Sequence, residues 1–148
     1  MNELSRDGVQ ELTGGCLCGA MRYLITARPL SVAYCHCRMC QRASGSPVVN
    51  WATLPLTAFR VTGGQLTFNR SSAKAERGFC ARCGSQMTFQ FTEGPNEIDV
   101  TVATLDDPAT LPPQYHIWTS SQQPWLLLGD TLPRHADDGK DFSPYKNS

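Results

Sequence analysis

Residues 34–41 read YCHCRMCQ, and this segment places Cys35, Cys37 and Cys40 within six positions of one another. In extended backbone, residues i and i+2 project to the same side, so Cys35 and Cys37 can aim both sulfurs at one ion. A short helix is predicted over about residues 38–43, ended by the Ser-Gly-Ser-Pro that follows. The helix therefore begins inside the cysteine cluster.

Two further cysteine pairs flank this cluster in the sequence, Cys16-x-Cys18 and Cys80-x-x-Cys83. The first pair has the same spacing as Cys35 and Cys37, and we expect it on extended backbone. The second needs a tight turn, which Gly84 directly after Cys83 permits. Cytoplasmic thiols are normally kept reduced, so clustered cysteines favour metal binding over disulfides.

Seven thiolates can be divided as four plus three. Four thiolates make a closed structural zinc site, whereas three protein ligands leave an open, catalytic position. The clusters can be combined in three ways, and the most economical keeps the local triplet together and joins the two pairs, although spacing alone does not establish this. Buried cysteines acting as small hydrophobes are the alternative for the pairs. A redox-active or empty thiol cluster, or a fourth protein ligand, is the alternative for the triplet.

The composition is that of an ordinary soluble globular protein, with 41% hydrophobic and 18% charged residues in 148. Thirteen basic residues balance thirteen acidic ones, which argues against a nucleic-acid or anionic-lipid partner. The N-terminus lacks a signal-like apolar core, and no apolar run is long enough to span a bilayer. We therefore expect a cytoplasmic protein with no membrane partner.

Short runs of β-branched and aromatic residues alternate with turn signals along the chain and predict an antiparallel, mostly β fold. The predicted strands cover residues 20–26, 48–54, 65–70, 85–91, 98–105 and 115–119. One domain is expected over residues 10–135, with flexible termini at 1–9 and 136–148.

Six motifs carry a resemblance to the glutathione-dependent formaldehyde-activating enzymes and the related centromere-protein-V group. These are GGCLCGAMRY (14–23), CHCRMCQRASGSP (35–47), GFCARCGSQM (78–87), TLDDP (104–108), YHIW (115–118) and PW (124–125). The resemblance covers most of the chain. It implies a β-tent, in which small antiparallel sheets lean together around a structural zinc.

The resemblance also implies a role for each cysteine. Cys16, Cys18, Cys80 and Cys83 would hold the structural zinc, and Cys35, Cys37 and Cys40 a second, catalytic and more labile Zn²⁺ whose open position takes the substrate. The implied reaction adds the glutathione thiol to formaldehyde, giving S-hydroxymethylglutathione, and its reverse is carbon–sulfur lyase chemistry. The partners would be a small thiol such as glutathione and an aldehyde.

Glutathione carries two carboxylates, so its site should offer cationic groups or backbone N–H donors. Arg38 and Arg42 lie beside the triplet and are the candidates, with simple solvation as the alternative for each. His36 should point away from the metal if its strand is regular. His116 is either a proton shuttle or a buried structural residue.

The three tryptophans, Trp51, Trp118 and Trp125, are expected in the core or in a pocket wall. Two other functions remain open from the sequence. One is a non-catalytic zinc module that binds a protein partner, which an exposed aromatic patch without a pocket beside the triplet would favour. The other is a zinc-ribbon-like nucleic-acid binder, which would need a basic face.

Overall fold

The computed structural model describes residues 10–140 and is mostly β, with one short α-helix, α1 (Arg38–Ser44). Four 3-10 turns, η1 to η4, connect some of the elements. The ten strands are β1 (Leu12–Gly15), β2 (Arg22–Ile25), β3 (Ser31–Cys35), β4 (Val49–Pro55), β5 (Phe59–Gly63), β6 (Thr67–Arg70), β7 (Ala75–Phe79), β8 (Gln86–Phe91), β9 (Glu97–Thr101) and β10 (Tyr115–Ile117).

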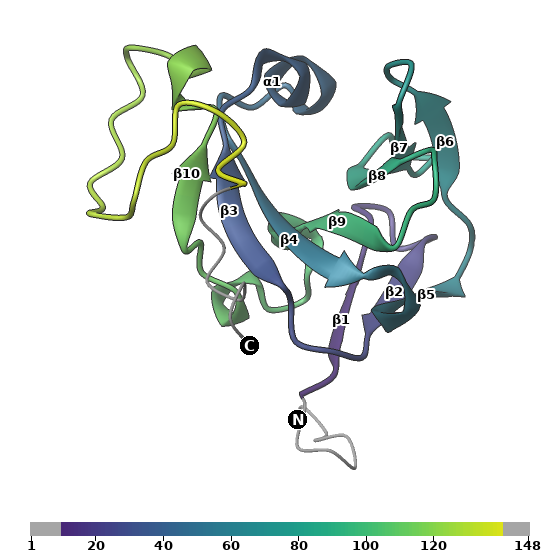
Figure 1. The fold of residues 1–148 in the computed structure, drawn as a ribbon. Coiled ribbons are helices and arrows are strands. Elements are labelled where there is room, and N and C mark those ends of the chain that lie inside the picture. The colour runs from purple at the N-terminus through teal and green to yellow at the C-terminus, as the bar shows by residue number, and fades with distance from the viewer. Residues whose placement is uncertain (1–9, 141–148) are drawn as a thin grey trace.

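The strands form two sheets that lean together. The short sheet has the order β1-β2-β5, and the long sheet has the order β10-β3-β4-β9-β8-β7-β6. In Figure 1 the long sheet bends so that β10, β3 and β4 stand opposite β6, β7 and β8, with β9 between them and the short sheet below. α1 lies above the ends of β3 and β4. This arrangement confirms the predicted mostly β, tent-like fold.

The main core lies where the two sheets meet. Ile25 and Tyr23 of β2 pack with Leu54, Met87 and Val100 of the long sheet, and each is almost completely buried. β9 buries Ile98 and Val100 while Asp99 between them faces the other side, which is the period-two alternation seen in the sequence. Burial of one face of each sheet therefore sets the register of the strands around the cysteines.

Several strand predictions need correction. β10 pairs with β3 in parallel, so the long sheet is not purely antiparallel. The predicted strand over 98–105 ends at Thr101, because the Thr104 hydroxyl donates to the Thr101 carbonyl and the chain turns into a 3-10 helix. β10 ends at Ile117, because Trp118 adopts a left-handed conformation with φ of 57°.

Four strands were not predicted, β1, β3, β5 and β7. β1 carries two glycines and β5 is largely exposed, so neither shows a clear apolar alternation. The remaining predicted strands and the helix are confirmed within about two residues at each end.

Part of the predicted flexible C-terminus lies within the described chain. The backbone N–H of Trp118 donates to the Asp137 carbonyl at 2.7 Å, and the Ser120 hydroxyl donates to the Ala136 carbonyl at 2.8 Å. Residues 1–9 and 141–148 lie outside the described residues, and the domain boundary at 135 stays a prediction.

Candidate metal and active site

Cys16 and Cys18 lie in the turn that joins β1 to β2. The Cys16 N–H donates to the Met21 carbonyl at 3.0 Å, and the Gly19 N–H donates to the Cys16 carbonyl at 3.1 Å. Gly19 has a φ of 80°, a conformation that favours glycine. The expectation of extended backbone is therefore wrong for this pair, and a turn brings its two sulfurs to 3.5 Å instead.

Cys80 and Cys83 lie in the turn between β7 and β8, as their spacing predicted. The Gly84 N–H donates to the Cys80 carbonyl at 2.7 Å, and Gly84 has a φ of 80°. The Cys80 N–H donates to the Ser85 carbonyl at 3.0 Å and closes the turn. The predicted role of Gly84 is confirmed.

The two turns meet, so that the sulfurs of Cys16, Cys18, Cys80 and Cys83 all lie within 4.8 Å of one another. The Sγ atoms of Cys18 and Cys80 are 3.8 Å apart. Ligands about 2.3 Å from a tetrahedral zinc are separated from one another by about 3.8 Å. The donor set and its spacing therefore fit a closed, four-thiolate metal site that links the two sheets.

Hydrogen bonds favour the ionised thiolate at two of the four cysteines, Cys16 and Cys83. The Met21 N–H donates to Cys16 Sγ at 3.3 Å. The hydroxyl and backbone N–H of Ser85 lower the pKa of the Cys83 thiol to about 5. The Ser85 hydroxyl also accepts a hydrogen bond from the Leu17 N–H at 3.0 Å, which connects the two turns directly.

The second cluster lies at the junction of β3 and α1. Cys35 ends β3, Cys37 is the N-cap of α1, and Cys40 lies in the first turn of that helix. Their three sulfurs lie within 4.8 Å of one another, and the Cys35 and Cys40 sulfurs are 3.6 Å apart. The described residues therefore divide their seven cysteines as four plus three, with the two pairs together.

Cys37 is the most exposed of these three cysteines. Its sulfur accepts a hydrogen bond from the Cys40 N–H at 3.2 Å. Hydrogen bonds from the Cys35 and Cys40 thiols, together with that N–H, lower the pKa of Cys37. The cluster therefore stabilises a thiolate at its accessible member.

Arg77 of β7 is part of the surroundings of the triplet, and sequence reasoning missed it. Its Nη2 lies 3.5 Å from Cys40 Sγ, and its Cζ lies 4.9 Å from the centre of the Phe89 ring. In the sequence, Arg77 lies three residues before Cys80, which belongs to the other cluster. No sequence signal therefore indicated that Arg77 contacts Cys40.

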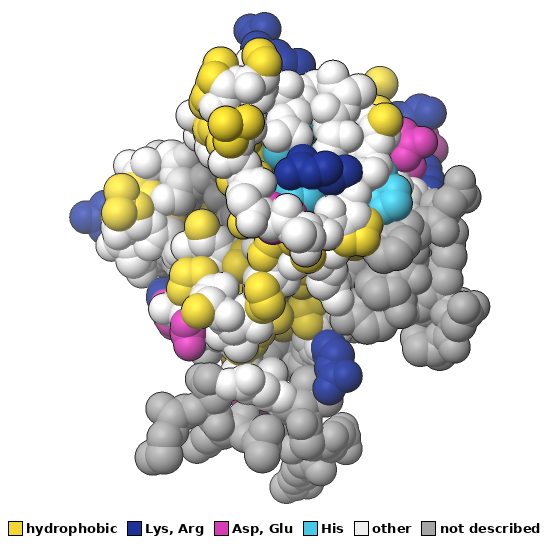
Figure 2. Space-filling model, turned by 90° about the vertical axis from the view of Figure 1, so that its left-hand side faces the viewer, with side chains coloured by type: hydrophobic (Ala, Val, Ile, Leu, Met, Phe, Trp, Pro, Cys, Tyr) yellow, Lys and Arg dark blue, Asp and Glu magenta, His cyan; other side chains and the backbone are white. Residues whose placement is uncertain are grey.

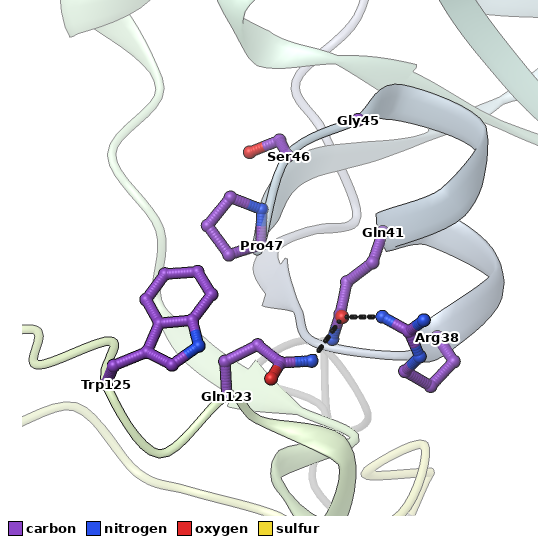
Figure 3. A pocket seen from close by; sticks show the side chains of 7 residues that line it. All are labelled: Arg38, Gln41, Gly45, Ser46, Pro47, Gln123 and Trp125. Carbon is purple, nitrogen blue, oxygen red and sulfur yellow. Dashed lines mark hydrogen bonds between the residues drawn. The ribbon is translucent and has the colours of Figure 1, made fainter.

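A pocket of about 450 Å³ opens beside α1 (Figure 3). It is lined by Arg38, Gln41, Gly45, Ser46, Pro47, Gln123 and Trp125. Arg38 donates to the Gln41 side-chain oxygen at 2.6 Å, and Gln123 donates to the same oxygen at 2.9 Å. Arg42 is exposed and is not among the lining residues. The predicted glutathione-binding role of both arginines remains a prediction.

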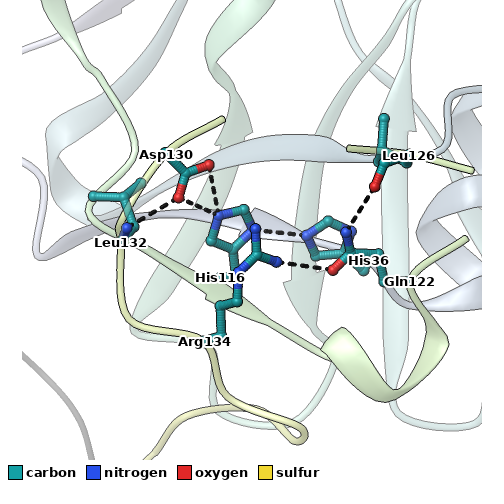
Figure 4. Close-up of polar contacts among 7 residues, drawn as sticks. All are labelled: His36, His116, Gln122, Leu126, Asp130, Leu132 and Arg134. Carbon is teal, nitrogen blue, oxygen red and sulfur yellow. Dashed lines mark hydrogen bonds and ion pairs between the residues drawn. The ribbon is translucent and has the colours of Figure 1, made fainter. Parts of the chain in front are cut away.

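His36 points toward His116 (Figure 4), and it is not part of the group formed by the three cysteines, as predicted. The two rings are completely buried, and His36 Nε2 lies 2.8 Å from His116 Nδ1. His116 Nε2 lies 2.9 Å from Asp130 Oδ1. Burial, and then the neighbouring His116, lower the pKa of His36 to about 4. Both nitrogens of His116 have partners, which favours the structural reading of this residue.

The tryptophans differ in their surroundings. Trp51 is buried and packs with Cys35 and Cys40, and Trp125 lines the pocket, so both predictions are confirmed. Trp118 is 38% exposed and belongs to neither core cluster, so the expectation of a core position is wrong for it, and it is not among the residues that line the pocket beside α1.

Fold and site define a class: a mostly β domain whose two cysteine clusters can each hold a metal ion. A family model described as glutathione-dependent formaldehyde-activating enzyme matches residues 11–121. The chain belongs to this family.

Curated relatives and a solved structure agree with this assignment. An uncharacterized lyase of Schizosaccharomyces pombe is 30% identical over 93 residues, 58% of this chain and 62% of the relative. The chain thus matches less than two thirds of that relative's length. A putative glutathione-dependent formaldehyde-activating enzyme of Halomonas elongata is 24% identical over 126 residues, 79% of this chain and 80% of the relative. A crystal structure of a Rhodobacter sphaeroides protein is 29% identical with a TM-score of 0.54, covering 66% of this chain and 93% of that one.

Two further observations concern membrane-spanning helices and basic surface. Between residues 10 and 140, no helix is long and apolar enough to cross a membrane. On the face drawn in Figure 2, the Lys and Arg side chains of the described residues lie at separated places and form no continuous basic surface.

Proposed function

We propose that the chain adds the thiol of glutathione, or of a related small thiol, to formaldehyde or a related aldehyde, and catalyses the reverse carbon–sulfur cleavage. The reaction centre is the triplet of Cys35, Cys37 and Cys40 carrying Zn²⁺, and the four-cysteine cluster holds a structural zinc. The observation that carries the proposal is a three-sulfur cluster at the start of α1, whose members Cys37 and Cys40 are followed in the chain by two residues, Arg38 and Gln41, that line a pocket of about 450 Å³.

The chemistry suits three sulfur ligands. A zinc ion held by them would supply one open position at which a thiol is deprotonated at neutral pH. In the forward reaction a sulfur–carbon bond forms, the carbonyl π pair moves to oxygen, and the proton lost by the thiol ends on that oxygen. No other reactant is needed.

The pocket supplies groups for the rest of a thiol peptide. Arg38 offers a guanidinium that can pair with a carboxylate, and the Gln123 amide lies at the same wall. Trp125 contributes an apolar surface that is 68% exposed. The polar wall and the exposed ring together match a small, charged, flexible peptide.

The test measures thiol-dependent consumption of formaldehyde by the zinc-loaded protein, with glutathione and with 2-mercaptoethanol. Cys37→Ser should abolish the reaction without changing the circular dichroism, because a serine hydroxyl still caps α1. Arg38→Gln should raise KM for glutathione about ten-fold and leave KM for 2-mercaptoethanol unchanged. Arg42→Gln is the matched variant outside the pocket, and an equal effect of both arginine variants would contradict the assignment of the pocket.

The alternative is a non-catalytic zinc-binding protein-interaction module. Trp125 and Leu127 favour it, because they lie two residues apart and are 68% and 88% exposed. A folded protein with both zinc ions but no activity on any thiol–aldehyde pair would support this alternative.

A further inference from the structure

A row of four side chains crosses the long sheet beside the triplet. Arg77 of β7 is the cross-strand partner of Phe89 of β8, and Phe89 is the partner of Asp99 of β9. Asp99 is in turn the partner of Thr53 of β4. Directly opposite residues share one face of a sheet. The row therefore presents a cation, an aromatic ring and a carboxyl group on the face toward which Arg77 reaches Cys40.

The guanidinium of Arg77 is buried, and only part of its hydrogen-bonding capacity is satisfied. The residue is 6% exposed, its Nη2 lies 3.5 Å from Cys40 Sγ, and its guanidinium lies over the Phe89 ring. Its Nη1 is buried and has no hydrogen-bond partner among the described residues. A buried, unpaired N–H of a charged group is costly, so a group that accepts from Nη1 would bind favourably there.

Among the described residues, no hydrogen bond or ion pair joins the neighbouring carboxyl group of Asp99 to Arg77. Asp99 Oδ1 accepts a hydrogen bond from the Thr53 hydroxyl at 2.6 Å, and Phe89 lies on the strand between β7 and β9. Burial also raises the pKa of Asp99 to about 7, which weakens its charge at neutral pH. The guanidinium therefore keeps one nitrogen free at a position next to a sulfur of the triplet.

We propose that Arg77 is a catalytic residue whose Nη1 binds the oxygen of the aldehyde and stabilises the negative charge that this oxygen gains as the sulfur–carbon bond forms. The proposal rests on the proposed function. A planar guanidinium suits this task because its two Nη atoms can serve Cys40 and the incoming oxygen at the same time. A preorganised donor of this kind acts most strongly where charge develops in the transition state.

The first test is a binding measurement that needs no turnover. Mercaptoacetate places an anionic oxygen near its sulfur and ethanethiol does not, so the zinc-loaded protein should bind mercaptoacetate about ten-fold more tightly. Isothermal titration should show that Arg77→Met loses this preference, while Arg60→Met, which removes an exposed arginine on β5, keeps it. Wild-type protein without the preference, or Arg77→Met with it, overturns the proposal.

Metal content and kinetics separate this role from a structural one. Native mass spectrometry should find the same zinc content in Arg77→Met as in wild type, with kcat for formaldehyde about 100-fold lower. Loss of the second zinc with an unchanged binding preference would mean that Arg77 only supports Cys40, and would overturn the proposal. If Arg77→Met does not fold, Arg77→Lys decides, because one ammonium nitrogen cannot serve both positions as a guanidinium does.

With Arg77→Lys, an unchanged preference for mercaptoacetate overturns the proposal and a lost preference supports it. Failure of the proposed function looks different, because wild-type protein would then consume no formaldehyde with any thiol. The binding preference remains measurable in that case and reports on Arg77 alone.

Discussion

Replacing Cys83 tests what holds the two sheets together. Its sulfur belongs to the cluster that joins the turn between β1 and β2 to the turn between β7 and β8. Cys83→Ser removes one of the four proposed zinc ligands and leaves a hydroxyl that remains protonated at neutral pH. We expect the variant to lose the structural metal.

The magnitude follows from what else connects the turns. A structural zinc contributes about 10–16 kcal/mol in small peptides, compared with about 5–15 kcal/mol for the stability of a whole domain. The hydrogen bond between the turns, from the Leu17 N–H to the Ser85 hydroxyl, contributes about 1 kcal/mol and cannot replace the metal. Losing even about 5 kcal/mol should lower the melting temperature by roughly 15 °C or leave the protein molten.

Cys37→Ser is the matched control, because Cys37 is also half-buried and also a predicted ligand. Its cluster is local in sequence, and serine is a good N-cap for α1. We expect this variant to lose only about 1 kcal/mol of folding stability. Its melting temperature should therefore fall by about 2–4 °C. Thermal melting and zinc content decide the matter: equal destabilisation, or a worse result for Cys37→Ser, would show that the four-cysteine cluster does not hold the fold together.

Three further predictions concern the zinc content, the Asp99 carboxyl group and Gly14. Purified protein should carry between one and two zinc ions per chain, with the second lost first on exposure to a mild chelator, and native mass spectrometry showing folded, metal-free protein would contradict this. The pKa of Asp99 rises from 3.8 to about 7 on folding through burial, so its ionisation destabilises the fold as pH rises between these values. Asp99→Asn should therefore raise the melting temperature at pH 8 but not at pH 4, and an equal shift at both pH values would refute the burial of this group. Gly14→Ala should lower the free energy of unfolding by about 2 kcal/mol or more, measured by chemical denaturation. The added Cβ would clash with the Tyr23 hydroxyl and would lie 2.6 Å from the Thr104 carbonyl oxygen. A variant as stable as wild type would show that the neighbouring atoms move aside without cost.

Much of the site could be predicted because its parts are local in sequence. Cys35, Cys37 and Cys40 lie within six positions, so any compact backbone keeps their sulfurs close. Gly84 predicted the turn after Cys80, because a positive φ favours a residue without a Cβ. Strands with apolar alternation were likewise found from their period of two.

Other features depend on long-range contacts that no local pattern encodes. Three combinations of the cysteine clusters were open until the packing of the two sheets brought the β1–β2 turn against the β7–β8 turn. The parallel pairing of β10 with β3 also joins segments about 80 residues apart in the chain. The hydrogen bond between the rings of His36 and His116 spans the same separation. Side-chain chemistry therefore determined what the clusters can bind, and sheet packing decided which cysteines share a site.

Arg77 illustrates the limit most clearly. The sequence places it three residues before Cys80, yet its guanidinium contacts Cys40, 37 residues earlier in the chain. That contact exists because the bend of the long sheet brings β7 toward α1. The amino-acid sequence by itself determined which residues can serve as metal ligands, the mostly β character and the family of this protein, because these depend on residue type and short spacing. Only the tertiary structure decided which charged side chain stands beside the cysteine triplet, because that depends on strand register and on how the sheets fold over one another.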